Sequence, residues 1–238
     1  LVLGVEAKAA STTFTLWAPT AQSVALCLHD ARDDTAVTLR HAHRDPETGT
    51  WSLRIDRDLS GGYYTWLVDV FVPGSGILRN RMTDPYSISL DTDSRHSWIG
   101  NLDAPTSKPD GWDDAPLPPG LAAQTDMVIY ELHVRYFSIS DRSVSAADRG
   151  KYLAFTHAAS DGMRHLRAMS DAGLTDVHLL PVFDIATIPE ADCVSPDVPD
   201  AAPDSERQQA VVMASAHRAR FNWGSNPFHS TPPEARST

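Results

Sequence analysis

Residues 127–134 read MVIYELHV, and together with DGMRHLRAMSDA at 161–172 and DVHLLPVF at 176–183 they decide the fold of the second half of the chain. The first and third stretches are nearly continuous apolar runs of strand length. The middle stretch places Met163, Leu166 and Met169 three residues apart, which is typical of a helix with one apolar face. Gly173 follows where a helix end favours a left-handed residue. Strand, helix and strand predict a βαβ unit whose parallel sheet is buried on both faces.

A long excursion follows this unit from Asp184 to Phe221 and is interrupted by prolines. A short helix is predicted to begin at Ser205, with Gln208 three residues later as its capping-box partner. Residues 222–238 are rich in Pro, Ser and Thr and show no periodicity. Excursions of this length inside a compact domain are usually functional or disordered.

Residues 1–100 predict a β-sandwich. Short alternating stretches at 13–17, 23–28, 51–55 and 63–72 are rich in Val, Thr, Tyr, Phe and Trp, and turn residues separate them. Several strands at this spacing favour a sandwich of about 100 residues. Residues 101–125 are a connector, because their prolines forbid a regular helix or a central strand. Trp112 is expected to pin this connector to a neighbouring domain.

The length of the second half bears on its completeness. A (β/α)8 barrel needs about 250 residues, and the residues from Met127 to Thr238 are fewer than half of that. One βαβ unit exposes strand edges and apolar faces that further strands would cover. We therefore expect an incomplete barrel, and the alternative is a smaller complete α/β domain.

Composition excludes some classes of function. The chain has 238 residues and a formal net charge of −11, which disfavours nucleic acid as a partner. No apolar run approaches the roughly 18 residues of a membrane span, and no signal peptide is visible. Cys27 and Cys193 either form one bridge or remain two free thiols, and by themselves they cannot build a tetrahedral metal site.

A family resemblance rests on segments spread over most of the chain. In order, they are FTLWAPTAQSVALCL (14–28), MTDPYSISL (82–90), VIYELHVRYFSISDRSV (128–144), RGKYLAFT (149–156), AGLTDVHLLPVFDIA (172–186), DSERQQA (204–210) and FNWGSNPFH (221–229). These segments resemble the pullulanase and limit-dextrinase group of starch-debranching enzymes, within glycoside hydrolase family thirteen. One such match would be weak, whereas an ordered series indicates homology.

The resemblance implies a multidomain β plus α/β architecture. Residues 1–100 would be a β-sandwich of carbohydrate-binding family forty-eight type, residues 101–125 a Pro-rich connector, and residues 126–238 the first βαβ unit of a truncated (β/α)8 barrel. Residues 127–134 and 176–183 would be the first two barrel strands. The long excursion would then be the loop after the second strand, on the rim where barrel enzymes build their sites.

The activity implied is hydrolysis of α-1,6-glucosidic branch points in pullulan, amylopectin or glycogen fragments with retention. This chemistry needs two carboxyl groups about 5 Å apart. In the family they lie on later barrel strands, beyond Thr238, so the resemblance implies no catalytic residue here and no activity of this chain alone. It implies substrate contacts by Trp223, Asn226 and Phe228, an α-glucan partner, no required cofactor with calcium left open, and a secreted or periplasmic bacterial parent.

Departures from the family pattern cluster near the end of the chain. Ser225 stands where the family carries a tyrosine that stacks on the sugar, and a hydroxymethyl group cannot replace a ring face. Ser230 also replaces a common aromatic, Tyr136 replaces an aspartate, and residues 232–236 depart from the pattern VPEGSY. These departures suggest decay, sequence error or a frame disturbance.

Other chemistry-bearing residues have structural interpretations. Tyr63, Tyr64 and Trp66 could stack on starch, but on an alternating strand at least half must point inward. Structural or solvated roles are expected for the sandwich tryptophans (Trp17 and Trp51, both in the core), for the histidines beside the βαβ unit (His133, His165 and His178) and for the carboxylates Glu131, Asp176 and Asp184.

Two alternatives remain beside the glycosidase fragment. The sandwich could serve as a non-catalytic α-glucan-binding module. The chain could also be an inactive relic without a ligand, which predicts exposed apolar surface and aggregation.

Overall fold

The computed structural model describes residues 2–29, 36–186, 188–194, 196–218 and 226–234. These residues form two compact units. The first comprises residues 1–115 with 229–232, and the second comprises residues 116–228 with 233–238. Each unit is described separately below.

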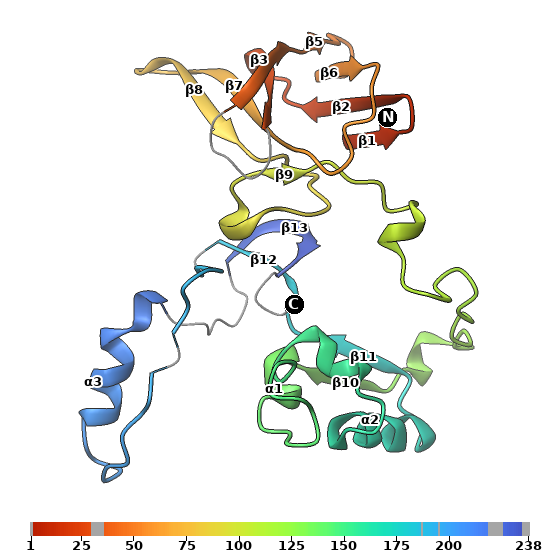
Figure 1. The fold of residues 1–238 in the computed structure, drawn as a ribbon, viewed down its shortest axis with the longest axis vertical. Coiled ribbons are helices and arrows are strands. Elements are labelled where there is room, and N and C mark those ends of the chain that lie inside the picture. The colour runs from red at the N-terminus through yellow and green to blue at the C-terminus, as the bar shows by residue number, and fades with distance from the viewer. Residues whose placement is uncertain (1, 30–35, 187, 195, 219–225, 235–238) are drawn as a thin grey trace. The chain divides into compact units, whose positions relative to one another are not determined.

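Two antiparallel sheets build the first unit (Figure 1). One sheet has the order β1 (Gly4–Lys8), β2 (Ser11–Trp17), β6 (Thr50–Ile55) and β5 (His43–Arg44). The other has the order β4 (Ala36–His41), β3 (Ala21–His29), β7 (Tyr63–Val72) and β8 (Gly76–Met82), and β9 (Ser97–Trp98) also pairs with β7. The predicted β-sandwich is therefore confirmed. The strand predictions at 13–17, 23–28, 51–55 and 63–72 coincide with β2, β3, β6 and β7.

Aromatic side chains from both sheets meet in the core of the sandwich. Phe14 of β2 lies edge-on to Tyr64 and Trp66 of β7, with ring centroids 5.0 and 6.4 Å apart, and all three side chains are fully buried. Edge-to-face contacts of this kind stabilise a core beyond the area that they bury. Tyr64 and Trp66 confirm that at least half of the aromatic residues of β7 point inward, whereas Tyr63 is only half-buried.

The two sandwich tryptophans have different environments. Trp51 is buried, at 7% exposure, and its indole N–H donates to the carbonyl of Ala18, so its predicted core position is confirmed. Trp17 is 57% exposed, and its predicted core position is wrong. Trp17 ends β2 beside the turn at 45–49, where its indole N–H donates to the carbonyl of Thr48. Trp17 follows the buried Leu16, so the alternation of side chains along β2 turns its ring to the opposite face of the sheet.

The connector contains no α-helix and no strand between residues 101 and 125, as its prolines predicted. Its regular structure is limited to the short 3-10 turns η2 (Pro105–Ser107) and η3 (Gln124–Asp126). Trp112 is 62% exposed, so the expectation that it pins the connector to a domain is wrong. It lies in a local turn, in which its carbonyl accepts from the N–H of Ala115.

The predicted βαβ unit is present in the second unit. Strands β10 (Ile129–Leu132) and β11 (Asp176–Leu179) pair in parallel, and α2 (Asp161–Asp171) connects them. Ser160 caps α2 by accepting from the N–H of Met163, and Gly173 follows with φ of 108°. Sequence analysis missed α1 (Val134–Ser138) and the 3-10 turn η4 (Tyr152–Thr156), which lie between β10 and α2.

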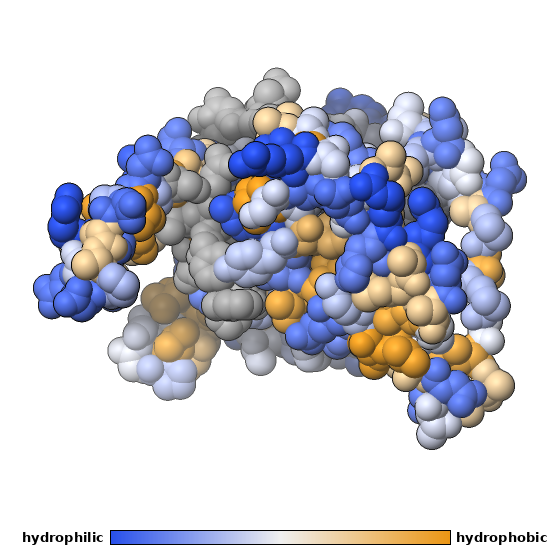
Figure 2. Space-filling model, turned by 90° about the horizontal axis from the view of Figure 1, so that it is seen from below, coloured by the Kyte–Doolittle hydropathy of each residue, from blue (hydrophilic) through white to orange (hydrophobic). Residues whose placement is uncertain are grey.

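The sheet of β10 and β11 is not buried on both faces, contrary to the prediction. Ile129 is 54% exposed and Val177 is 46% exposed. A two-stranded sheet with one crossover helix offers too few neighbours to cover both faces. Apolar side chains also reach the surface among hydrophilic ones elsewhere, as Figure 2 shows for one face.

The excursion and the tail contain more regular structure than predicted. The predicted second strand at 176–183 divides at Pro181: β11 ends at Leu179, and β12 (Phe183–Ile185) pairs with β13 (Pro227–Pro233). Helix α3 (Arg207–Ala214) starts after the predicted Ser205. The capping box is wrong, because the Gln208 amide donates to the carbonyl of Ala201 instead. The 3-10 turn η5 (Ala216–Arg218) follows α3.

Cys27 and Cys193 are both free thiols in this structure, and Cys27 is buried. Burial raises the pKa of the Cys27 thiol. Within the described residues, no helix is long and apolar enough to cross a membrane.

Candidate functional site

Two of the three predicted sugar-contacting residues lie at the start of β13. Asn226 and Phe228 are both exposed, with Phe228 at 53%. The carbonyl of Asn226 accepts a 3.1 Å hydrogen bond from the N–H of Ala186, just after β12. Trp223 lies outside the described residues, as does Ser225. The structure therefore places two of the predicted contacts on one short segment that is anchored to β12.

The far end of β13 is anchored by a glutamate that sequence analysis did not single out. Glu234 is only 3% exposed, and its carboxylate accepts a 3.0 Å hydrogen bond from the N–H of Ile185. Its own N–H donates to the carbonyl of Val182 at 2.8 Å. The signal was available, because Pro233 and Glu234 match the proline and glutamate of VPEGSY within a segment that otherwise departs from this pattern.

The carboxylates near the βαβ unit differ in exposure. Asp176 is half-buried and accepts from the hydroxyl of Thr175 at 2.6 Å, and Glu131 is exposed with the imidazole of His178 3.8 Å away. These two fit the expected strand-end and solvated roles. Asp184 is 2% exposed, so solvation does not describe it. It sits inside β12, where a buried carboxylate must be satisfied by neighbouring polar groups.

The histidines of the βαβ unit have local contacts. His133 caps α1 by accepting from the N–H of Arg135, and the ring of His165 lies edge-on to Tyr130 at 6.2 Å. No group of three or more His, Cys, Asp or Glu side chains among the described residues is arranged to hold a metal ion. These positions support the structural interpretation of His133 and His165.

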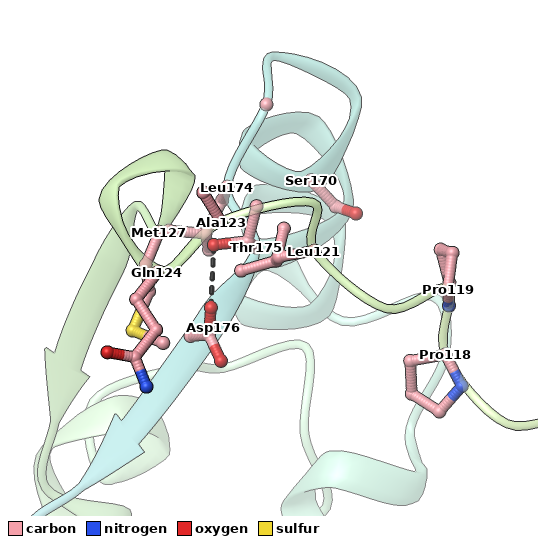
Figure 3. A pocket seen from close by; sticks show the side chains of 11 residues that line it. Pro118, Pro119, Leu121, Ala123, Gln124, Met127, Ser170, Leu174, Thr175 and Asp176 are labelled. Carbon is pink, nitrogen blue, oxygen red and sulfur yellow. Dashed lines mark hydrogen bonds between the residues drawn. The ribbon is translucent and has the colours of Figure 1, made fainter.

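A hollow of about 750 Å³ lies beside the βαβ unit, between the end of the connector and the turn after α2 (Figure 3). Leu121, Met127 and Leu174 give it an apolar lining, and Thr175 and Asp176 add hydrogen-bonding groups. Met127 precedes β10 and Asp176 begins β11, so the hollow lies at the amino ends of both strands. Ligands of parallel α/β sheets generally bind at the carboxyl ends of the strands. The position of this hollow therefore does not suit a reaction site.

A buried carboxylate organises the aromatic residues of the sandwich. One oxygen of Asp84 accepts from the Tyr64 hydroxyl and from the Trp66 indole N–H, both at 2.9 Å. Its other oxygen accepts from the backbone N–H of Tyr86 at 2.8 Å. Burial raises the pKa of the Asp84 carboxyl, and the hydrogen bonds from Trp66, Tyr86 and Tyr64 oppose that shift. Tyr64 and Trp66 thus serve the core and present no face to a sugar.

A second polar cluster of the sandwich was also missed by sequence analysis. The backbone N–H and the imidazole of His96 both contact the carboxylate of Asp91, at 2.7 and 2.6 Å, and the guanidinium of Arg81 lies 2.9 Å from Nε2 of the same ring. A guanidinium only donates, so Nε2 accepts and Nδ1 carries the proton that faces Asp91. These contacts hold the end of β8 against the residues that precede β9.

Comparison with known proteins agrees with this architecture. Residues 2–87 match the family model of carbohydrate-binding module 48, the isoamylase N-terminal domain. The sandwich is therefore a module of this class.

The whole chain is 34% identical to a pullulanase of Klebsiella pneumoniae over 275 aligned residues, which cover 98% of this chain and 25% of the relative. It is 36% identical to the chloroplastic pullulanase 1 of Arabidopsis thaliana, over 94% of this chain and 24% of that protein. Over nearly its whole length, the chain is therefore homologous to part of these pullulanases. It spans about a quarter of the length of the curated relatives that it matches.

Solved pullulanase structures share the fold. The ligand-free enzyme PulA from Klebsiella pneumoniae superposes with a TM-score of 0.89 at 31% identity, covering all of this chain and 26% of that one. A pullulanase of the same organism in complex with maltotriose gives the same TM-score and identity.

Proposed function

We propose that this chain is part of a pullulanase-type α-1,6-glucosidase that hydrolyses branch points in pullulan, amylopectin or glycogen fragments by retaining double displacement. The observation that carries the proposal is the 34% identity to a pullulanase across 98% of the chain. The maltotriose complex of a structural neighbour supports an α-glucan as the ligand.

The proposed organisation follows from the two sequence patterns. Residues 1–100 act as the carbohydrate-binding module, residues 101–125 as a connector, and residues 126–238 as the beginning of a (β/α)8 barrel. The parallel pairing of β10 with β11 through α2 supports the barrel start. The exposed apolar side chains of Ile129 and Val177 are the surface that further barrel elements would cover.

Trp223, Asn226 and Phe228 are the proposed glucan contacts. A flat aromatic ring such as that of Phe228 offers an apolar face to a pyranose ring. The amide of Asn226 can both donate to and accept from sugar hydroxyls. The exposure of Asn226 and Phe228 supports this role, because neither side chain is needed to fill a core.

None of the chain's carboxylates is proposed as nucleophile or acid–base. A retaining glycosidase needs two carboxyl groups about 5 Å apart on either side of the scissile bond. Glu234 is committed to the backbone of β12, and Asp176 to the hydroxyl of Thr175. No cofactor takes part in the proposal. The purified chain is therefore expected to bind glucan without releasing reducing sugar.

Affinity electrophoresis in native gels with and without pullulan tests this proposal. Wild type should migrate more slowly in pullulan, and Phe228→Ala should lose most of that retardation. Leu117→Ala is the control, since Leu117 is an exposed apolar side chain of the connector, at 91%. Equal mobility of wild type in both gels would contradict glucan binding, and release of reducing sugar from pullulan would contradict the absence of catalytic residues.

The second candidate is a non-catalytic α-glucan-binding module that acts through the sandwich alone. The match of residues 2–87 to carbohydrate-binding module 48 favours it. This candidate predicts that Phe228→Ala migrates like wild type in the pullulan gel, so the same experiment separates the two functions.

A further inference from the structure

Four residues from the far end of the chain belong to the first unit, which contains the sandwich. The chain leaves this unit after residue 115 and returns to it for residues 229–232, which lie within β13. His229 is 5% exposed and Pro232 is fully buried, whereas Ser230 and Thr231 are exposed. The segment therefore withdraws two of its four side chains from solvent.

A buried hydrogen bond identifies where this segment attaches. Nε2 of His229 and the hydroxyl of Thr83 lie 2.8 Å apart, and Thr83 is 8% exposed. Thr83 lies between the end of β8 and Asp84, the acid that accepts from Tyr64 and Trp66. Because both partners are buried, removal of one would leave the other without water to replace it.

The imidazole of His229 also acts on Asp84. Burial raises the pKa of the Asp84 carboxyl, and hydrogen bonds together with the charge of His229 oppose that rise. A positive charge has this effect because it favours the ionised carboxylate. The segment thus contributes to the polar interior of the sandwich beyond its own hydrogen bond to Thr83.

The covalent route from the sandwich to this segment passes through the exposed connector. Residues 109–125 are exposed throughout, and Leu117 reaches 91%. Exposed connecting segments are preferred sites of proteolytic cleavage. A cut after Leu117 would leave residues 229–232 on the carboxyl-terminal piece and Thr83 on the amino-terminal piece.

We propose that the sandwich is a docking surface for residues 229–232, and that this contact attaches the carbohydrate-binding module to the later half of the chain independently of the connector. The partner is a segment of this same chain. Its chemistry is an imidazole that hydrogen-bonds to Thr83, followed three positions later by a buried proline. The inference does not require glucan binding and goes beyond the proposed function.

The test uses the full chain with a protease recognition sequence inserted after Leu117. On size-exclusion chromatography, the cleaved wild type should elute together with the uncut chain. His229→Ala and Thr83→Val each remove the buried hydrogen bond, and each should raise the Kd between the two pieces at least about tenfold. Thr231→Ala, at an exposed position of the same segment, is the matched control and should change that Kd by less than about twofold.

Two further measurements locate the attachment. The combination of His229→Ala with Thr83→Val should raise the Kd no more than the stronger single change, because both changes remove one bond. A synthetic peptide of residues 227–234 should displace the carboxyl-terminal piece from the cleaved wild type. The same peptide with His229→Ala should need at least about a tenfold higher concentration. Circular dichroism of the uncut variants at the assay temperature shows which of them are folded.

The outcomes decide the proposal without reference to glucan. Separation of the cleaved wild type into two pieces would overturn it. Equal Kd values for wild type, His229→Ala and Thr83→Val would also overturn it, since the attachment would then lie elsewhere. If a variant does not fold before cleavage, the peptide decides with wild type alone, and failure to displace the carboxyl-terminal piece in large excess overturns the docking. Binding to pullulan is measured separately, so either result leaves the proposed function standing.

Discussion

The hydroxyl of Tyr64 donates a 2.9 Å hydrogen bond to the carboxylate of Asp84 in the interior of the sandwich. Tyr64 is on β7, and Asp84 lies in the turn that follows β8. Trp66 and the backbone of Tyr86 complete the set of donors around this carboxylate. Through this one buried carboxylate, the segment MTDPYSISL contacts the aromatic core. A segment of the family pattern therefore contributes to the stability of the module.

Replacing Asp84 by Asn should destabilise the sandwich by about 1–3 kcal/mol. The carboxylate accepts from three donors, whereas an amide has only one oxygen and would turn its NH2 group toward one of those donors. Urea unfolding followed by tryptophan fluorescence measures the change in the free energy of unfolding. Asp114→Asn, at an exposed position of the connector, should change it by less than about 0.5 kcal/mol, and equal values for both variants would contradict the role of Asp84.

The pKa of Asp69 should depend on Arg79. The guanidinium of Arg79 contacts both oxygens of this carboxylate at 2.8 Å and lowers the pKa of Asp69 from 3.8 to about 2. Because the folded pKa lies below the unfolded one, this pair supports folding above pH 3.8 and loses that effect as the pH falls toward 2. Arg79→Met should raise the pKa of Asp69 toward 3.8 in an NMR titration, and an unchanged titration would refute the assignment.

The two sandwich tryptophans should respond differently to truncation. Trp51→Ala removes a buried ring and should cost about 3–5 kcal/mol of stability. Trp17→Ala removes an exposed ring with one hydrogen bond and should cost about 1 kcal/mol or less. Thermal unfolding of both variants checks the contrast, and a larger loss for Trp17→Ala would reverse the burial assignment.

The amino end of α2 should depend on Ser160. Its side chain is 1% exposed and accepts from the N–H of Met163 at 3.2 Å. Ser160→Ala should therefore cost about 1 kcal/mol, the usual effect of losing an N-cap. Far-ultraviolet circular dichroism during urea unfolding measures it. Ser170→Ala, on the exposed face of the same helix, should be neutral or slightly stabilising, and similar losses in both variants would count against a capping effect.

Much of the fold could be predicted because it depends on neighbouring residues. Alternation along 63–72 predicted β7, and the spacing of Met163, Leu166 and Met169 predicted α2. Elements that depend on distant partners were missed. Strand β13 has no periodic pattern of its own, and it exists because β12 pairs with it. The prediction that Trp112 docks the connector was also wrong. A large apolar side chain is buried only where another part of the chain provides an apolar surface for it, and the local sequence does not show whether such a surface exists.

The candidate site also combines features that the sequence predicted with features that it did not. The family pattern led to Asn226 and Phe228, and both proved to be exposed. The departures after Ser230 suggested decay, yet Glu234 is buried and bonded to Ile185. Comparison of the sequence with the family pattern does not show which residue of a poorly matching segment is still buried and hydrogen-bonded.

The amino-acid sequence by itself determined the β-sandwich, the βαβ unit and the relationship to pullulanases, because strand alternation, helical spacing and ordered motifs are local properties of the chain. Only the tertiary structure decided that Trp51 is buried and Trp17 exposed, that Asp84 gathers Tyr64 and Trp66, and that Glu234 reaches Ile185. Each of these contacts joins residues separated by many positions, and whether two such residues meet depends on how the intervening strands pack.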